Sequence, residues 1–257
     1  MTEGPSARAK AIYVEKNVGG QKVVDIFTRS KKTHVSPKEF IGRKLEYTDS
    51  YGKNIILVFG PYAIRIHLMM YGTIHIYGPN QPLAKPERYV RLLILFETNK
   101  VVVYNAPIVE LDLKANIIRY LQRTLGEDPL REDWDQERAI DLILKHRNEK
   151  IGAVLLNQGV IAGIGNILRN EILFRARIHP DRYVRDLTRD ELRRIVSIAY
   201  SLSREFLRRK LNKQRIGPIL YVYNKFKKKC KICGHPIRYY RQPPHNRRTF
   251  VCENCQK

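Results

Sequence analysis

The stretch Gln158-Gly-Val-Ile-Ala-Gly-Ile-Gly-Asn166 joins two segments, residues 151–157 and 167–174, whose apolar residues favour helices. Gly163 and Gly165 allow the backbone to turn tightly between them. We predict that Asn166 caps the second helix, whose unpaired backbone N–H groups then point outward. Such a helix end binds a phosphate, and the Asn166 side-chain amide adds a donor to it. Glycine and asparagine are also common at helix ends for structural reasons alone, so the motif by itself is compatible with a structural role and with a phosphate-binding role.

Two longer helices are predicted on either side of this turn, over residues 135–146 and 187–210. Their apolar residues recur at helical spacing. The positions are Ala139, Leu142, Ile143, Leu192, Ile195, Val196, Ala199, Leu202, Phe206 and Leu207. We therefore expect a helical domain over residues 126–224.

All four cysteines follow this domain, as Cys230-x-x-Cys233 and Cys252-x-x-Cys255. Each pair forms a knuckle whose two thiolates face one point, and four thiolates complete a closed tetrahedral site. We predict one structural Zn²⁺ bound by all four. Two disulfides are the alternative, and a reducing compartment disfavours them.

Residues 238–251 lie between the cysteine pairs, with Gln242-Pro-Pro-His-Asn246 at their middle. This pattern predicts a β-hairpin with an arginine-rich tip that presents Arg247 and Arg248 to a phosphate or a base edge. His235 and His245 could in principle bind the metal. Because four thiolates already complete the site, we favour surface or phosphate-facing roles for both. The predicted zinc finger occupies residues 225–257.

The charge of the chain indicates a polyanionic partner. It has 257 residues with 48 Lys and Arg against 25 Asp and Glu, a formal net charge of +23. No acidic residue lies between Glu205 and Glu253, and aromatic residues interleave with the basic ones there. We therefore predict a structured phosphate-binding region. Nucleic acid is the first candidate partner, and an anionic lipid surface or ribosomal RNA are the rivals.

Composition also excludes some classes of protein. A hydrophobic content of 43% is enough for real cores, which excludes a disordered polycation. No segment reaches the roughly 20 apolar residues of a spanning helix, so we expect no membrane association. Residues 1–15 are charged and lack the apolar region of a secretory signal, so we expect a cytoplasmic, nucleoid-associated or nuclear protein.

The N-terminal half is predicted to be β-structure. Seven strand-like runs are separated by Gly, Pro, Asn or charged turns. They are residues 23–29, 44–50, 54–59, 63–68, 73–77, 88–98 and 101–105. Many strands at short spacing favour a sandwich or barrel, with a helix over residues 5–16 packed on it. The expected fold class is α+β: a β-sandwich with flanking helices over residues 1–125, the helical domain and the finger hairpin.

Together these motifs resemble the formamidopyrimidine-DNA glycosylase/endonuclease VIII family, in order along the whole chain. The matching segments are Met1-Thr-Glu-Gly-Pro5, Gly52-Lys53, His67-Leu-Met-Met-Tyr-Gly72, Leu156-Asn-Gln-x3-Ala-Gly-Ile-Gly-Asn166, Phe174-x4-His179-Pro180 and Arg247-Arg-Thr-Phe-x-Cys252-x-x-Cys255-Gln256. The resemblance implies a bifunctional DNA-repair glycosylase with a β-sandwich, a helix-two-turn-helix domain and a zinc finger. It is closer to the endonuclease VIII type. Residues 104–110 stand where the other branch has an Arg-Phe-Gly loop, and Tyr71 follows the two methionines.

The resemblance also implies the catalytic groups. A glycosylase-lyase needs an amine to attack C1′, and an α-amino group, with a pKa of about 7.7–8.0 against about 10.4 for lysine, is a suitable one. In the family this amine belongs to a proline exposed by removal of Met1, and here the residue is Thr2. Glu3 matches the catalytic carboxylate, and Lys53 matches the lysine that binds the phosphate near the lesion. Ser6 replaces a second family glutamate.

Three further residues are candidates for the wedge that fills the space of an extruded base. Met69, Met70 and Tyr71 supply adaptable apolar mass and an aromatic face at a turn between strands, although ordinary core methionines are the alternative. Arg247 is favoured over Arg248 because it lies five residues before Cys252, the position of the family's finger arginine.

The sequence thus predicts a monomeric DNA glycosylase with AP-lyase activity that removes oxidised bases and has damaged or abasic DNA as its partner. The alternative is a non-catalytic homologue that keeps the helical and zinc modules and binds nucleic acid.

Overall fold

The computed structural model describes residues 2–244 and 246–257 and divides the chain into two compact units. The first contains Thr2 and residues 6–123, and the second contains residues 3–5 and the chain from Thr124 onward. The division of the second unit into a helical domain and a separate finger stays a prediction.

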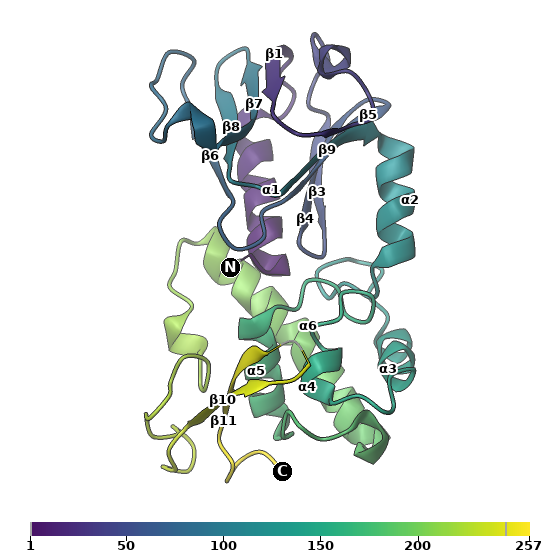
Figure 1. Ribbon diagram of the computed structural model, residues 1–257, viewed down its shortest axis with the longest axis vertical. Coiled ribbons are helices and arrows are strands. Elements are labelled where there is room, and N and C mark those ends of the chain that lie inside the picture. The colour runs from purple at the N-terminus through teal and green to yellow at the C-terminus, as the bar shows by residue number, and fades with distance from the viewer. Residues whose placement is uncertain (1, 245) are drawn as a thin grey trace. The chain divides into compact units, whose positions relative to one another are not determined.

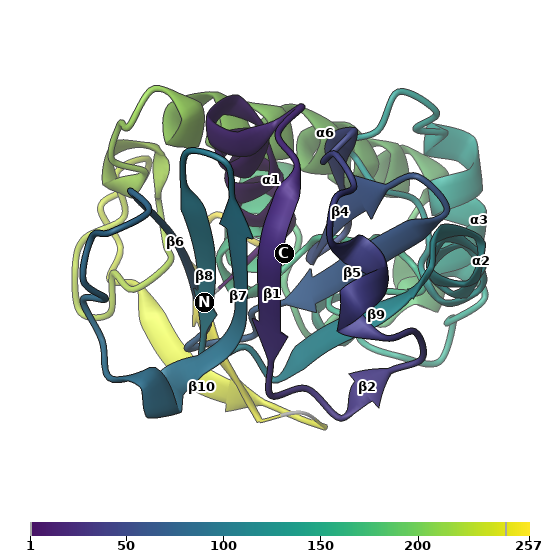
Figure 2. The ribbon, with the colours of Figure 1, turned by 90° about the horizontal axis from the view of Figure 1, so that it is seen from above.

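The first unit is a β-sandwich, as predicted (Figures 1 and 2). One sheet has the order β1-β7-β8-β6 and the other β2-β9-β5-β4-β3. The strands are β1 (Val23–Thr28), β2 (Lys32–Thr33), β3 (Tyr47–Tyr51), β4 (Asn54–Phe59), β5 (Tyr62–His67), β6 (Thr73–Tyr77), β7 (Val90–Phe96), β8 (Lys100–Tyr104) and β9 (Ile108–Leu113). Apart from β2 and β9, each overlaps a predicted strand.

Apolar side chains from both sheets form one buried cluster. Leu57 and Ile64 come from the five-stranded sheet, and Ile94 and Val103 come from the four-stranded sheet. The helix α1 (Gly4–Val18) packs on the sandwich, as expected, and adds four small or branched apolar residues to the cluster. They are Ala7, Ala11, Val14 and Val18.

The central residues of strand β5 are buried on both faces. Arg65 is among them, and it donates from Nε to Glu110 of β9 at 2.5 Å. Strand β9 lies between β2 and β5, and it leads into helix α2 (Lys114–Thr124). Neither strand β9 nor the bounds of α2 were predicted from the sequence.

The second unit is helical around its own apolar core, as predicted. Its elements are α3 (Gln136–Leu144), α4 (Ile151–Val154), α5 (Asn166–Ala176) and α6 (Arg189–Leu211). Asp135 caps α3, and Thr188 forms a capping box with Glu191 at the start of α6. Such caps fix where the helices begin. None of the helices in the described part of the chain is long and apolar enough to cross a membrane.

The chain ends in the predicted hairpin, formed by β10 (Arg238–Gln242) and β11 (Arg247–Val251), which lie beside α5 (Figure 1). Their register pairs Gln242 with Arg247 next to the tip. The apolar cluster under the hairpin is small, with six buried residues. They are Phe174, Val222, Cys230, Ile237, Phe250 and Cys252.

Candidate active site and cysteine cluster

Glu3 occupies the N-terminus of helix α5. Its side chain is fully buried, and its two carboxylate oxygens accept from the backbone N–H of Ile167 at 2.6 Å and of Leu168 at 3.1 Å. A helix N-terminus carries partial positive charge and stabilises a carboxylate there. The prediction that these N–H groups point outward to a phosphate is therefore wrong for the two that bind Glu3.

The glycines before α5 leave room for this carboxylate. A Cβ on Gly165 would lie 2.6 Å from the carboxyl carbon of Glu3, closer than atoms in contact come. Gly163 has φ of +87° and accepts through its carbonyl from the N–H of Gly4 at 2.8 Å. The predicted tight turn is confirmed. The close approach of the N-terminal segment is a second reason for small residues at this turn.

Asn166 is the first residue of α5, and Gly165 is the N-cap, so the predicted cap is displaced by one residue. The Asn166 side chain is buried, and its Nδ2 donates to the carbonyl oxygen of Arg248 at 2.8 Å. Its Oδ1 has no hydrogen-bond partner among the described residues. The structure therefore brings Asn166 to the backbone of the hairpin, next to Arg247, whose side chain is half-buried.

In the first unit, Thr2 lies against the predicted wedge. Its backbone nitrogen donates to the carbonyl oxygen of Met69 at 3.1 Å. Met69, Met70 and Tyr71 connect β5 with β6 and are 46%, 54% and 75% exposed. The alternative that they are core residues is wrong, because a core residue would be buried.

His67 supports the same loop, and the charge of Lys53 acts on His67. Lys53 follows Gly52, with φ of +57°, in the turn between β3 and β4. Burial, the charge of Lys53 and that of Arg65 lower the pKa of His67 to about 4, so its imidazole is neutral near pH 7. The neutral Nδ1 accepts from the N–H of Met69 at 3.2 Å. No role for His67 was predicted from the sequence. Its position at the end of a strand, close to the two methionines, was the feature that could have indicated one.

The four cysteines gather at one point of the second unit. All four sulfur atoms lie within 4.8 Å of one another. Cys230 lies 3.9 Å from Cys255, and Cys233 lies 3.4 Å from Cys252. These separations exceed a disulfide bond, and all four thiols are free, so the two-disulfide alternative is wrong. The cluster is compatible with a structural zinc site of four thiolates.

Of the two histidines of this region, His235 is not part of the cluster. His235 is exposed, and its backbone carbonyl accepts from the N–H of Cys230 at 2.7 Å. His245 lies outside the described residues.

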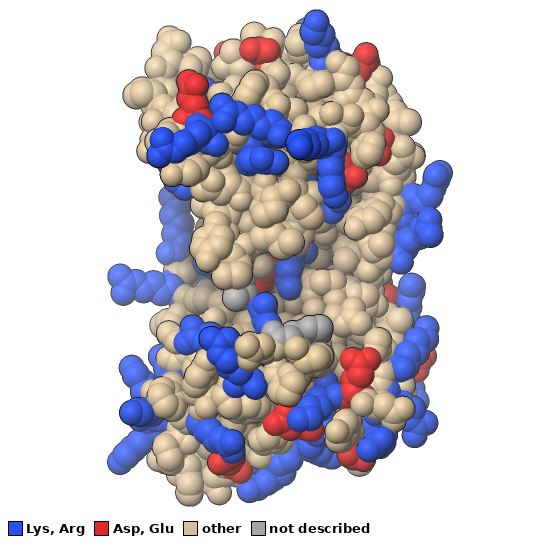
Figure 3. Space-filling model, in the orientation of Figure 1, with Lys and Arg blue, Asp and Glu red and all other residues tan. Residues whose placement is uncertain are grey.

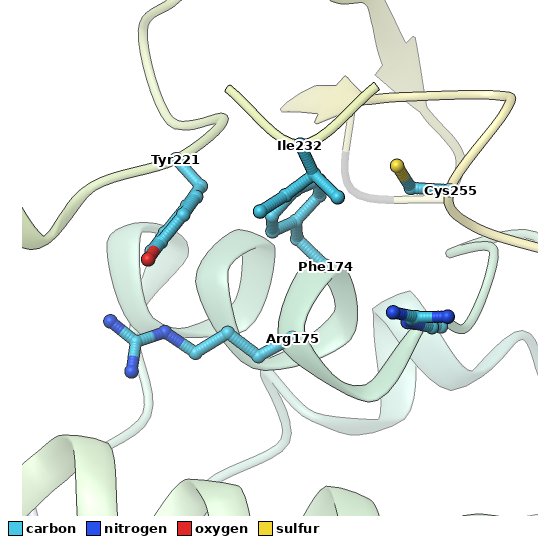
Figure 4. A pocket seen from close by; sticks show the side chains of 6 residues that line it. Phe174, Arg175, Tyr221, Ile232 and Cys255 are labelled. Carbon is cyan, nitrogen blue, oxygen red and sulfur yellow. The ribbon is translucent and has the colours of Figure 1, made fainter. Parts of the chain in front are cut away.

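A hollow of about 220 Å³ lies beside the cysteine cluster (Figure 4). The Phe174 and Tyr221 rings stack in its wall with their centroids 5.4 Å apart, and Arg175 lies 5.4 Å from the Tyr221 centroid. Ile232 and Cys255 complete the labelled lining. The aromatic contact joins the end of α5 to the segment that precedes the finger.

Basic side chains are the more numerous charged groups on one face of the protein. Figure 3 shows that Lys and Arg outnumber Asp and Glu on the visible face. Such an excess attracts a polyanion over long range and makes its binding salt-dependent.

The fold and the cysteine cluster are those of a known class of DNA-repair proteins. The sequence model of the formamidopyrimidine-DNA glycosylase N-terminal domain matches residues 1–107, and that of the formamidopyrimidine-DNA glycosylase H2TH domain matches residues 125–215. The chain belongs to the formamidopyrimidine-DNA glycosylase/endonuclease VIII family.

Relatives of both types occur. A formamidopyrimidine-DNA glycosylase of Wolbachia pipientis is 31% identical over 76% of this chain and 74% of its own length. Endonuclease 8 1 of Mycobacterium bovis is 33% identical over 84% of this chain and 85% of its own length. A structure of Lactococcus lactis Fpg (MutM) in complex with a DNA containing N7-benzyl-Fapy-dG has a TM-score of 0.88, with 99% of each chain covered. At 23% identity this last likeness shows the fold.

Proposed function

We propose that this protein is a bifunctional DNA glycosylase and AP lyase that removes oxidised bases, with the amine of Thr2 as nucleophile. The main support for this proposal is that the first two described residues are both held by hydrogen bonds. The Thr2 nitrogen is held by the Met69 carbonyl, and the carboxylate of its neighbour Glu3 is held by two backbone N–H groups of α5. Family membership supports the same reaction.

The proposed chemistry begins after removal of Met1, which turns the Thr2 nitrogen into a primary amine. The amine attacks C1′ of the extruded nucleotide, the bond from C1′ to the base breaks, and the base leaves with the bonding electrons and a proton. Loss of the amine proton and opening of the sugar give an imine between Thr2 and C1′. Protonation makes this imine an electron sink, so that a C2′ proton is lost and the 3′ phosphate is eliminated.

Glu3 manages protons in this scheme. A carboxylic acid adjacent to the amine donates a proton to the ring oxygen as the sugar opens, and the carboxylate takes a proton from the amine. Full burial of Glu3 and its two N–H donors fix the carboxyl orientation, which a proton transfer requires.

The DNA is proposed to contact both units through charged and apolar groups. Lys53, Arg247 and the second N–H of the Asn166 amide bind phosphates, and Met69, Met70 and Tyr71 fill the space of the extruded base. The exposure of these three consecutive apolar side chains supports the wedge, since a contiguous exposed apolar patch marks a binding surface. Cys230, Cys233, Cys252 and Cys255 are proposed to bind one structural Zn²⁺ that holds the hairpin.

We further propose that the protein acts as a monomer in the cytoplasm or nucleus and is closer to the endonuclease VIII type. The alternative function is a non-catalytic nucleic-acid-binding homologue, motivated by Thr2 in place of proline and Ser6 in place of glutamate. Both functions use the same DNA contacts, so only the covalent step separates them.

Borohydride trapping on abasic-site DNA tests the proposal. The protein with a free Thr2 amine is expected to form a covalent adduct, and a version with an N-terminal extension is expected to lose it while keeping its DNA affinity, because an amide nitrogen cannot attack C1′. Thr2→Pro should retain or raise the yield, and Thr2→Val should change it little. An adduct from the extended protein would contradict the mechanism and point to a lysine such as Lys53. No adduct from any version, with DNA binding intact, would favour the non-catalytic homologue.

A further inference from the structure

Arg169 is a buried cation that the mechanism above does not use. It lies in the first turn of α5, is 1% exposed and is the largest of the fully buried side chains. Nη1 donates to Gln242 Oε1 at 2.6 Å and to the Gly152 carbonyl at 3.3 Å. Nη2 donates to Thr249 Oγ1 at 2.8 Å and to the Arg248 carbonyl at 3.0 Å. All four acceptors are neutral oxygens.

Burying a charged guanidinium among neutral acceptors lowers the free energy of unfolding unless its hydrogen bonds compensate for the lost hydration. A guanidinium loses its hydration on burial, and here burial lowers the pKa of Arg169 to about 10, which leaves it charged near pH 7. Apolar residues of similar size usually pack a helix onto a neighbouring element at lower cost. The planar fork offers directed donors, which an apolar side chain does not have.

Three of the acceptors lie on the hairpin, on both sides of its tip. Gln242 is the last residue of β10, and Arg248 and Thr249 belong to β11. Gln242 is the register partner of Arg247. The fork of Arg169 therefore fixes both strands at the position of Arg247.

Neighbouring polar groups complete the same frame. Thr249 Oγ1 donates to the Arg247 carbonyl at 3.0 Å, and Asn170 Oδ1 accepts from the N–H of Phe250 at 2.7 Å. Gln242 Nε2 donates to the Pro180 carbonyl and to Asp181, each at 2.8 Å. The backbone around Arg247 is thus held by α5 side chains, with Arg169 at the centre.

The position of Gly152 is a separate sign that this frame is tightly fitted. A Cβ on Gly152 would lie 2.5 Å from Gln242 Oε1, the same oxygen that accepts from Arg169. The glycine therefore leaves the space in which Gln242 meets the fork.

We propose that Arg169 is a positioning residue that orients Arg247 toward a DNA phosphate, an inference that rests on the proposed phosphate contact of Arg247. Arg169 does not itself touch the DNA. Its fork holds the hairpin backbone, and the backbone sets the direction in which the Arg247 side chain leaves β11.

Salt-dependent binding to a duplex with a tetrahydrofuran abasic analogue tests the proposal. Arg247→Ala is expected to weaken binding about tenfold and to lower the slope of log affinity against log salt by about one. Arg169→Met and Arg169→Lys are both expected to reproduce much of this change, because lysine keeps the charge but lacks the fork. Adding Arg169→Met to Arg247→Ala should change affinity and slope little further.

Arg175→Met is the matched control. Arg175 lies on the same helix, and its replacement by methionine removes the same charge. Its side chain donates to the carbonyl of Ile219, which is not part of the hairpin. It should leave the salt slope unchanged. Zinc content and circular dichroism identify folded variants, and Thr249→Val, which removes one acceptor of the fork, provides a milder second variant.

The outcomes separate the two proposals. If Arg247→Ala lowers the slope but Arg169→Met only lowers thermal stability, or if the two losses add in full, Arg169 has a merely structural role and the inference is wrong. If Arg247→Ala itself leaves affinity and slope unchanged, the phosphate contact is wrong, and the inference about Arg169 is overturned with it.

Discussion

The sandwich and the finger hairpin of this protein are stabilised by different means. The buried apolar cluster of the sandwich contains 23 of the described residues, drawn from both sheets and α1, whereas the cluster under the hairpin contains six, of which two are cysteines. A region that buries little apolar surface needs other sources of stability. In the finger these are the four clustered thiols and directed polar contacts with α5.

Glu171 shows how the polar contacts substitute for apolar area. Its buried carboxylate accepts from the backbone N–H groups of Tyr221, Val222 and Tyr223, at 2.7–3.0 Å. Burial raises the pKa of this carboxyl, and the three N–H donors oppose the rise. Glu171 thus ties the segment before the finger to α5, as Arg169 ties the hairpin. In the second unit, oriented polar groups therefore hold the hairpin and the segment before it more than apolar burial does.

Removal of zinc should have the largest effect and should act on the finger alone. With the metal chelated, or with Cys252→Ser, we expect the last 30 or so residues to unfold, because a structural zinc contributes folding free energy directly. Affinity for abasic-site DNA should fall about 100-fold or more, since the phosphate contacts of the hairpin are lost. Hydrogen exchange should show the sandwich strands as protected as before.

The complementary variant, which should act on the sandwich and not on the finger, is Leu57→Ala in the core of the sandwich. Leu57 is fully buried, so the cavity should cost about 2–5 kcal/mol of unfolding free energy. Zinc content and finger protection should remain unchanged. A metal-free protein that binds DNA as well as the zinc-loaded protein would contradict the comparison.

Gly165→Ala should have the next largest effect, on chemistry rather than on folding. The added methyl group would lie 2.6 Å from the Glu3 carboxyl group, so the carboxylate must leave the N-terminus of α5. Base excision should fall about tenfold or more, as expected when a general acid is misplaced. Borohydride adduct formation at a preformed abasic site should fall less, since the base is already absent. Gly217→Ala is the control, because a Cβ there meets nothing within 4 Å; equal losses in both variants would contradict the proposed role of Glu3.

The sequence was a better guide to the apolar framework than to the polar contacts. Strands rich in apolar residues, such as Asn54–Phe59 and Thr73–Tyr77, were predicted with their observed bounds, because apolar runs bounded by turn residues indicate buried strands directly. Strand β9 was missed because Glu110 and Asp112 resemble a polar connection. Its partner strand β5 lies more than 40 residues earlier in the sequence, and there Arg65 pairs with Glu110.

The candidate site shows the same limit. Motif spacing identified the four cysteines that the structure brings together, whereas the contact of Thr2 with Met69 became visible only in the structure. It could not identify Arg169, because arginine side chains are usually exposed. Three of its four acceptors lie on the hairpin, 73 to 80 residues later in the sequence, and no local pattern predicts that contact.

The smallest expected effect concerns His67, a polar exception within the apolar sandwich. Its pKa of about 4 in the folded state lies below the value of about 6.5 for an unfolded histidine, so the unfolded chain binds the proton more readily. The free energy of unfolding should therefore fall as the pH falls from about 7 toward 4, and His67 should contribute about 1 kcal/mol of this loss between pH 7.5 and 5.5. Urea unfolding of the wild type and of His67→Asn, whose Oδ1 can still accept from the N–H of Met69, measures the difference. The variant should lose less stability on acidification. If the His67 imidazole instead titrates near pH 6.5 in the folded protein, a neutral His67 does not anchor the loop of Met69, Met70 and Tyr71.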